Sequence, residues 1–99
     1  MAFALTFEAQ SPVIDDDLTV VVEATRPRGP GGRAPLESDW RRIGAASVAS
    51  AQGGLDIEGW YEAVFGAPRI GQVFYLRGSV FENLTGQRSA PFVLRVPVE

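Results

Sequence analysis

Three residue types are missing from this chain of 99 residues: cysteine, histidine and lysine. Without cysteine there is no disulfide, thiol nucleophile or thiolate metal ligand, and without histidine there is no imidazole ligand or imidazole acid–base catalyst. Without lysine, Schiff-base and P-loop phosphate chemistry are excluded as well. These absences remove most enzyme classes, so we expect a protein that is not an enzyme and that needs no cofactor.

Long apolar runs are missing too. No stretch approaches the roughly 20 apolar residues that a membrane helix needs, and Glu8 interrupts the apolar start too early for a signal peptide. We therefore expect a soluble chain with no membrane span and no signal peptide. Its length predicts one domain, residues 1–99, with a single core.

Positive charge is scarce, because nine arginines stand against twelve acidic residues and the net charge is −3. Binding to a phosphate backbone needs a basic surface, so we expect no nucleic-acid partner. The use of arginine in place of lysine indicates a GC-rich genome, or else a need for the planar guanidinium, which pairs with carboxylates in a bidentate manner.

The strongest pattern lies in the last third of the chain. Residues 72–82 and 90–98 are two apolar runs joined by a polar turn, and in each run every second residue is apolar on the same side. They predict an antiparallel β-hairpin. The side chains that we expect to be nearly buried in it are Phe74, Leu76, Val80, Phe92, Leu94 and Val96.

Three other segments, residues 3–9, 18–25 and 38–45, predict shorter strands. In the second of them the residues expected to point inward are Leu18, Val20 and Val22. The small residues from 45 to 54 either continue the third strand or cross the surface.

Residues 56–66 predict the only helix. Asp56 suits the N-cap, and Gly66 followed by Pro68 suits the end of the helix. The apolar residues of this segment, spaced three or four apart, form a stripe that closes one end of a stack of sheets: Ile57, Tyr61, Val64 and Phe65.

The strand pattern resembles a fibronectin type III or related immunoglobulin-like domain, of a bacterial or phage type. Residues 17–23 are similar to that family's strand B, with Val22 at the place of its core tryptophan. Residues 71–80 are similar to strand F, with Phe74 at the place of its buried tyrosine, and residues 83–91 match the connection from strand F to strand G.

The resemblance implies an all-β fold, an antiparallel sandwich of six or seven strands, here with one short helix near residues 56–66. Phe74 has no hydroxyl group, so the tyrosine-corner hydrogen bond of such sandwiches cannot form there. Domains of this family share no common activity, so the resemblance implies an architecture and a role in binding.

Residues 26–35 hold three prolines, three glycines and three arginines, which predicts a mobile loop. Arg26, Arg28 and Arg33 give this loop a positive charge that suits an acidic surface of a partner protein. A disordered loop without a partner and a phosphate-binding loop are the alternatives, and no aromatic residue is interleaved to stack on bases.

Two further groups of residues are candidates for small ligands. Trp40, Trp60, Tyr61 and Tyr75 suit an aromatic platform for a sugar, or else they pack in the core. Asp15, Asp16 and Asp17 offer oxygens to a calcium ion, or else they form a solvated acidic turn. Calcium takes about six to eight ligands and these three lack the spacing of a calcium loop, so we expect weak binding at best.

Two functions remain open. The first is a non-enzymatic β-sandwich interaction module, a structural component of a larger assembly such as a virion, an appendage or a self-associated particle. The second is a small glycan- or metal-binding domain. The absence of catalytic residue types and of a ligand motif favours the first, with a protein partner that is either another component or further copies of the chain.

Overall fold

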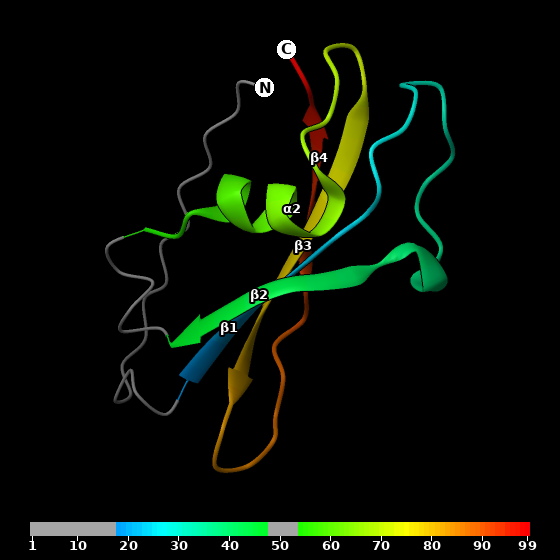
Figure 1. Cartoon of the computed structure of the whole chain (residues 1–99). Helices are drawn as coiled ribbons and strands as arrows, with labels where there is room; N and C mark the ends of the chain where they lie inside the picture. Colours follow the sequence, from blue (N-terminus) through cyan, green and yellow to red (C-terminus); the bar gives the residue numbers. More distant parts are fainter. Residues whose placement is uncertain (1–17, 48–53) are drawn as a thin grey trace.

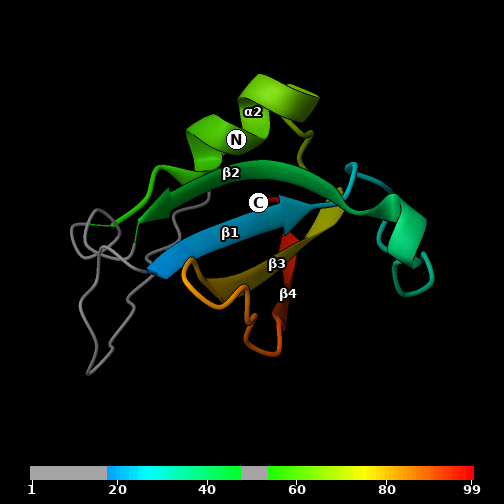
Figure 2. The same cartoon turned by 90° about the horizontal axis from the view of Figure 1, so that it is seen from below.

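The structure is a computed structural model that describes residues 18–47 and 54–99. Its regular elements are β1 (Leu18–Ala24), β2 (Arg41–Ser47), α2 (Ile57–Phe65), β3 (Val73–Glu82) and β4 (Phe92–Pro97). All four strands belong to one antiparallel sheet in the order β2-β1-β3-β4, shown from two sides in Figures 1 and 2. A short 3-10 turn, Glu37–Asp39, precedes β2.

The prediction of a mostly β chain with one short helix is confirmed. The strands predicted at 18–25, 72–82 and 90–98 are present, with the last two paired antiparallel, and the third predicted strand begins at Arg41 instead of residue 38. The described residues contain a single open sheet and no second one, so the sandwich is not confirmed. The strand predicted at residues 3–9 lies outside the described residues.

The core lies between α2 and one face of the sheet. Every second residue of β1 is buried there, from Leu18 to Ala24, as the alternation predicted. The helix contributes Ile57 and Tyr61, and the ring of Tyr61 stacks on that of Phe74 with 4.1 Å between centroids. This pair joins the helix to the middle of the sheet.

Local signals fix the ends of α2 as predicted. Asp56 accepts a hydrogen bond from the backbone N–H of Gly59 at 3.0 Å, which makes it the N-cap. Gly66 ends the helix with a φ of 79°, a conformation that glycine adopts without steric cost. Trp60 packs directly over Gly44 of β2, where any Cβ would collide with the indole ring, so the helix lies close to this strand.

The predicted burial of the hairpin is correct for Phe74, Leu76 and Val96 but wrong for Phe92 and Leu94 of β4. Phe92 is 50% exposed and Leu94 is 40% exposed. Both lie on an edge strand, and Phe92 is paired with Gly78, away from the Phe74–Val96 pair that the helix covers. Val80 is only partly buried.

The exposure of β4 agrees with the position of the helix. Figure 2 shows α2 beside β2, with β4 as the strand most distant from the helix. No helix in the described part of the chain is long and apolar enough to span a membrane.

Candidate functional site

A shallow groove of about 430 Å³ is lined by three arginines that come from three separate segments. Arg26 follows β1, Arg41 is the first residue of β2, and Arg69 lies between α2 and β3. The other lining residues are Pro27, Val64, Phe65, Ala67 and Gln72. We call this site, defined by Arg26, Arg41 and Arg69, the arginine groove.

Three hydrogen bonds hold the residue that precedes Arg26. The backbone N–H of Thr25 donates to the carbonyl of Tyr75 at 3.0 Å, and the N–H of Tyr75 donates to the Thr25 hydroxyl at 3.0 Å. The buried Tyr61 hydroxyl donates to the Thr25 carbonyl at 2.9 Å. Arg26 therefore starts from a fixed backbone position, although its own side chain is exposed.

The other two arginines are placed by the sheet and by a turn. Arg41 is paired with Ala24, the last residue of β1, so the sheet register brings it to the same end as Arg26. The N–H of Arg69 donates to the side-chain oxygen of Gln72 at 2.7 Å, and the N–H of Gln72 donates back to the Arg69 carbonyl at 3.0 Å. This closed turn fixes the backbone of Arg69.

The arginine groove is positively charged and uncompensated. None of its three guanidinium groups forms an ion pair with a described residue, and all three residues are exposed. The last residues of α2 line the groove, and the negative end of a helix dipole amounts to roughly half an elementary charge. That offsets only part of three full positive charges, so the groove attracts anions.

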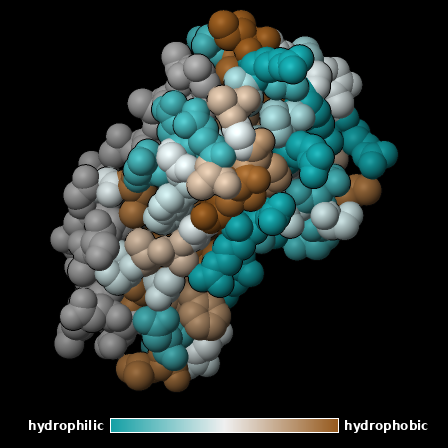
Figure 3. All heavy atoms as spheres, viewed as in Figure 1, coloured by the Kyte–Doolittle hydropathy of each residue, from teal (hydrophilic) through white to brown (hydrophobic). Residues whose placement is uncertain are grey.

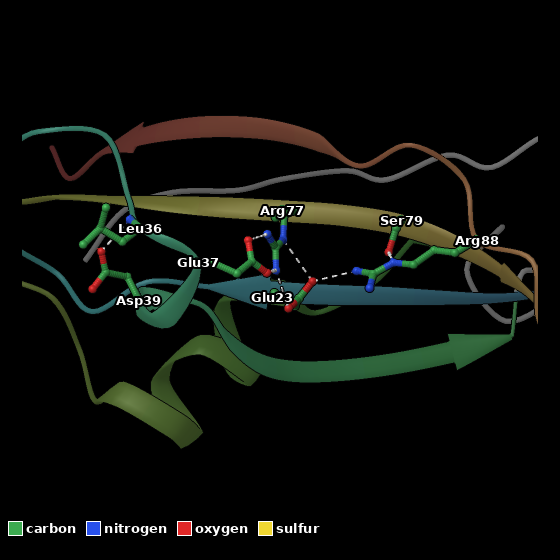
Figure 4. A network of polar contacts seen from close by, with 7 residues as sticks. All are labelled: Glu23, Leu36, Glu37, Asp39, Arg77, Ser79 and Arg88. Atoms are coloured by element: carbon green, nitrogen blue, oxygen red, sulfur yellow. Dashed lines mark hydrogen bonds and ion pairs between the residues drawn. The ribbon is translucent and has the colours of Figure 1, made fainter.

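In a second group of arginines the guanidinium groups are paired with carboxylates of the same chain (Figure 4). Arg77 donates from Nε and Nη2 to the two carboxylate oxygens of Glu23 at 3.0 and 2.8 Å. Its Nη1 and Nη2 donate to Glu37 at 3.0 and 3.1 Å, and its guanidinium lies 4.6 Å from the ring centroid of Trp40. Arg77 is therefore saturated by two carboxylates and one aromatic face.

Arg88 completes this network from the loop after β3. Its Nη2 donates to Glu23 at 2.8 Å and its Nε donates to the Ser79 hydroxyl at 2.9 Å. The hydrogen bond from Arg77 is the main cause that holds the pKa of Glu23 below its ordinary value, and the same arginine lowers the pKa of Glu37. Glu23, Glu37, Ser79, Arg77 and Arg88 form what we call the neutralised network.

A larger groove of about 460 Å³ lies beside the neutralised network, lined in part by Glu23, Arg42 and Arg88. Its carboxylate offsets one of its two arginines, so it attracts anions less than the arginine groove does. Figure 3 shows the face seen in Figure 1, on which hydrophilic and apolar residues are interspersed and apolar surface lies in the middle as well as at the upper and lower ends. We therefore place the candidate site in the arginine groove.

The structure separates the three arginines that the sequence grouped together. Arg26 lines the groove and Arg33 is exposed outside it. Arg28 exchanges two backbone hydrogen bonds with Val73, at 2.9 and 2.8 Å, and its guanidinium lies 5.6 Å from the ring centroid of Tyr75. The loop predicted to be mobile is thus tied to the sheet at Arg28, whose buried Nη2 has no hydrogen-bond partner among the described residues.

Arg41 and Arg69 were not predicted as site residues. Each stands alone in its own segment, and only the register of β1 with β2 and the turn before β3 bring them to Arg26. A prediction of the β1–β2 pairing would have found Arg41. No local pattern points to Arg69.

The four candidate aromatic residues have four different surroundings. Tyr61 is fully buried in the core, and Trp60 covers Gly44. Trp40 lies against Arg77, and Tyr75 lies against Arg28. The structure therefore does not bring them together as one platform.

No group of three or more acidic side chains in residues 18–47 and 54–99 is arranged to hold a metal ion. Asp15, Asp16 and Asp17 lie outside the described residues.

Comparisons of the chain with protein-family models, with curated proteins and with solved structures found no match. The function is therefore inferred from the site.

Proposed function

We propose that the protein is a non-enzymatic interaction module, a component of a larger protein assembly, that binds an acidic segment of a partner protein in the arginine groove. The observation that carries this proposal is the presence, around one groove of a chain of net charge −3, of three exposed guanidinium groups that form no ion pair with a described residue. A fibronectin type III-like or immunoglobulin-like sandwich remains part of this proposal as the class of fold.

Arginine suits this role because its planar group binds a carboxylate through two parallel hydrogen bonds. Because the three arginines lie on separate segments of the chain, they can bind more than one carboxylate of the partner. Val64 and Phe65 add an apolar wall to the groove, which suits an apolar side chain next to the acidic residues. The preferred ligand is thus an Asp- or Glu-rich segment that also carries an apolar residue.

An acidic peptide fits the whole molecule better than a nucleic acid does. A phosphate backbone presents a continuous line of negative charge, which a chain of net charge −3 repels outside the groove. A short acidic segment needs only the local positive charge. Because the candidate aromatic residues are separated, no observation favours a sugar as the ligand.

Titration with an octaglutamate peptide tests the proposal. We expect binding that weakens as salt is raised, and a loss of at least about tenfold in affinity when Arg26, Arg41 and Arg69 are all replaced by Gln. The matched control replaces Arg33, Arg42 and Arg95 by Gln, which changes the net charge equally at exposed positions outside the groove.

Equal losses in the two triple variants would contradict the proposal, because net charge alone would then explain the binding. Tighter binding of a single-stranded oligonucleotide than of the peptide at the same salt would also contradict it.

A further inference from the structure

β4 is an edge strand, and its outer side pairs with no segment of residues 18–47 or 54–99. Its exposed apolar side chains are Phe92, Val93 and Leu94, which are 50%, 56% and 40% exposed. Edge strands of stable monomers usually carry charges, prolines or a bulge that prevents pairing with another chain. β4 carries one charge, Arg95, and has no register shift against β3, and its prolines, Pro91 and Pro97, flank the edge without interrupting Phe92–Val96.

The hydrogen bonds around Val98 show which backbone groups of β4 point outward. The N–H of Val98 donates to the Gln72 carbonyl at 2.9 Å and its carbonyl accepts from the N–H of Gly71 at 3.0 Å, so both groups point toward the β3 side. Backbone groups alternate along an antiparallel strand. Those of Val93 and Arg95 therefore point away from β3.

Prolines bracket this outward pair. Pro91 and Pro97 occupy the next outward positions and have no N–H to donate. The free edge thus offers two N–H groups, those of Val93 and Arg95. A strand that matches this edge has two N–H groups that point toward β4, and it needs no further N–H donors from β4.

We propose that two copies of this chain pair antiparallel through β4 about a two-fold axis, with Leu94 opposite Leu94 of the second copy. In this register Val93 of each copy lies opposite Arg95 of the other, and the two residues exchange both of their backbone hydrogen bonds. Pro91 lies opposite Pro97, so neither proline stands where Val93 or Arg95 needs an N–H donor for its carbonyl. The two sheets become one continuous sheet.

Neighbouring registers fit less well. Pairing centred on Arg95 places two guanidinium groups directly opposite each other, which is destabilising. Pairing centred on Val93 places Arg95 opposite Pro91, which accepts a hydrogen bond but returns none. Only the register centred on Leu94 pairs all four outward N–H and C=O groups of each copy at Val93 and Arg95.

The chain contains no cysteine, which makes single-cysteine crosslinking a direct test. Leu94 lies at a non-hydrogen-bonded position of the proposed pairing, where opposite Cα atoms are about 4.5 Å apart, within the range that a disulfide spans. Under mild oxidation we expect Leu94→Cys to form a covalent dimer at least about tenfold faster than Leu84→Cys, which changes an exposed residue in the turn after β3. Val93→Cys should crosslink more slowly than Leu94→Cys, because the two Val93 residues lie diagonally across the axis.

Amide hydrogen exchange of the unaltered chain provides a test that does not depend on any variant. Raising the protein concentration should slow exchange at Val93 and Arg95, while Leu94 and Val96 stay protected throughout by their bonds to β3. The proposal is overturned if Val93 and Arg95 exchange at the same rate at all concentrations, or if Val93→Cys crosslinks faster than Leu94→Cys. It does not depend on the arginine groove, so either proposal can fail without the other.

Discussion

Arg77 and Arg41 both belong to strands of the same sheet, but their guanidinium groups have different surroundings. Arg77 is bound by Glu23 and Glu37 and its side chain is only 12% exposed. Arg41 is exposed and forms no ion pair with any described residue. An arginine that is already saturated contributes to the stability of its own chain, whereas an unpaired one keeps its hydrogen-bond donors for a partner.

Removing the saturated arginine should have the largest effect on stability. Arg77→Ala leaves Glu23, whose side chain is 16% exposed, without its bidentate partner. We expect a loss of about 3 kcal/mol in the free energy of unfolding, measured by urea denaturation. Arg33→Ala, at an exposed position outside the network, is the control and should stay within about 0.5 kcal/mol of the parent chain. Equal effects of the two substitutions would show that the network contributes nothing.

Glu23→Gln tests the contribution of the neutralised network through the pH dependence of the free energy of unfolding. At neutral pH the loss of its charged hydrogen bonds should cost about 2 kcal/mol. Because the folded pKa of Glu23 lies below the ordinary value of 4.5, its contribution is present above that pH and is lost as the pH falls through the lowered pKa. The difference between the variant and the parent chain should therefore shrink below pH 4.5, and a constant difference would contradict this assignment.

Tyr61→Phe tests the backbone anchor beneath the arginine groove. The substitution removes the hydroxyl that donates to the Thr25 carbonyl and leaves the ring stack on Phe74 in place. We expect a loss of about 1 kcal/mol by thermal unfolding. Burial raises the pKa of this hydroxyl, so the unfolded chain ionises first above pH 10 and the parent chain should lose stability there. The variant has no hydroxyl at this position, so it should not show the loss of stability above pH 10 that comes from Tyr61.

The smallest effect on stability should come from the arginine groove itself. Replacing Arg26, Arg41 and Arg69 together by Gln removes three exposed charges that repel one another and that form no ion pair within residues 18–47 and 54–99. The free energy of unfolding should change by less than about 1 kcal/mol. A loss as large as that of Arg77→Ala would show that the groove has a structural role and would contradict the comparison.

Regular elements of this chain were predictable because their signals are local. Asp56 and Gly66 mark the ends of α2, and alternating apolar residues mark β1, β3 and β4. Alternation tells which side of a strand is apolar, but it does not tell whether another element covers that side. This is why Phe92 and Leu94 were expected to be buried and are exposed.

The arginine groove was only partly predictable for a related reason. Arg26 belongs to a visible cluster along the chain, but Arg41 and Arg69 reach it through strand pairing and through the turn that Gln72 closes. Likewise, the pairing of Glu23 with Arg77 and Arg88 depends on the register of β1 with β3 and on the loop that follows. Contacts of this kind depend on sheet register, which a single sequence does not specify.

The most direct test of the comparison is to follow the Nε–H signals of all nine arginines by nuclear magnetic resonance while octaglutamate is added. We predict that the signals of Arg26, Arg41 and Arg69 shift together and saturate, while that of Arg77 stays in place because its donors are occupied by carboxylates. Shifts of Arg77 and Arg88 at the same peptide concentration, or no shift in the groove, would contradict the account.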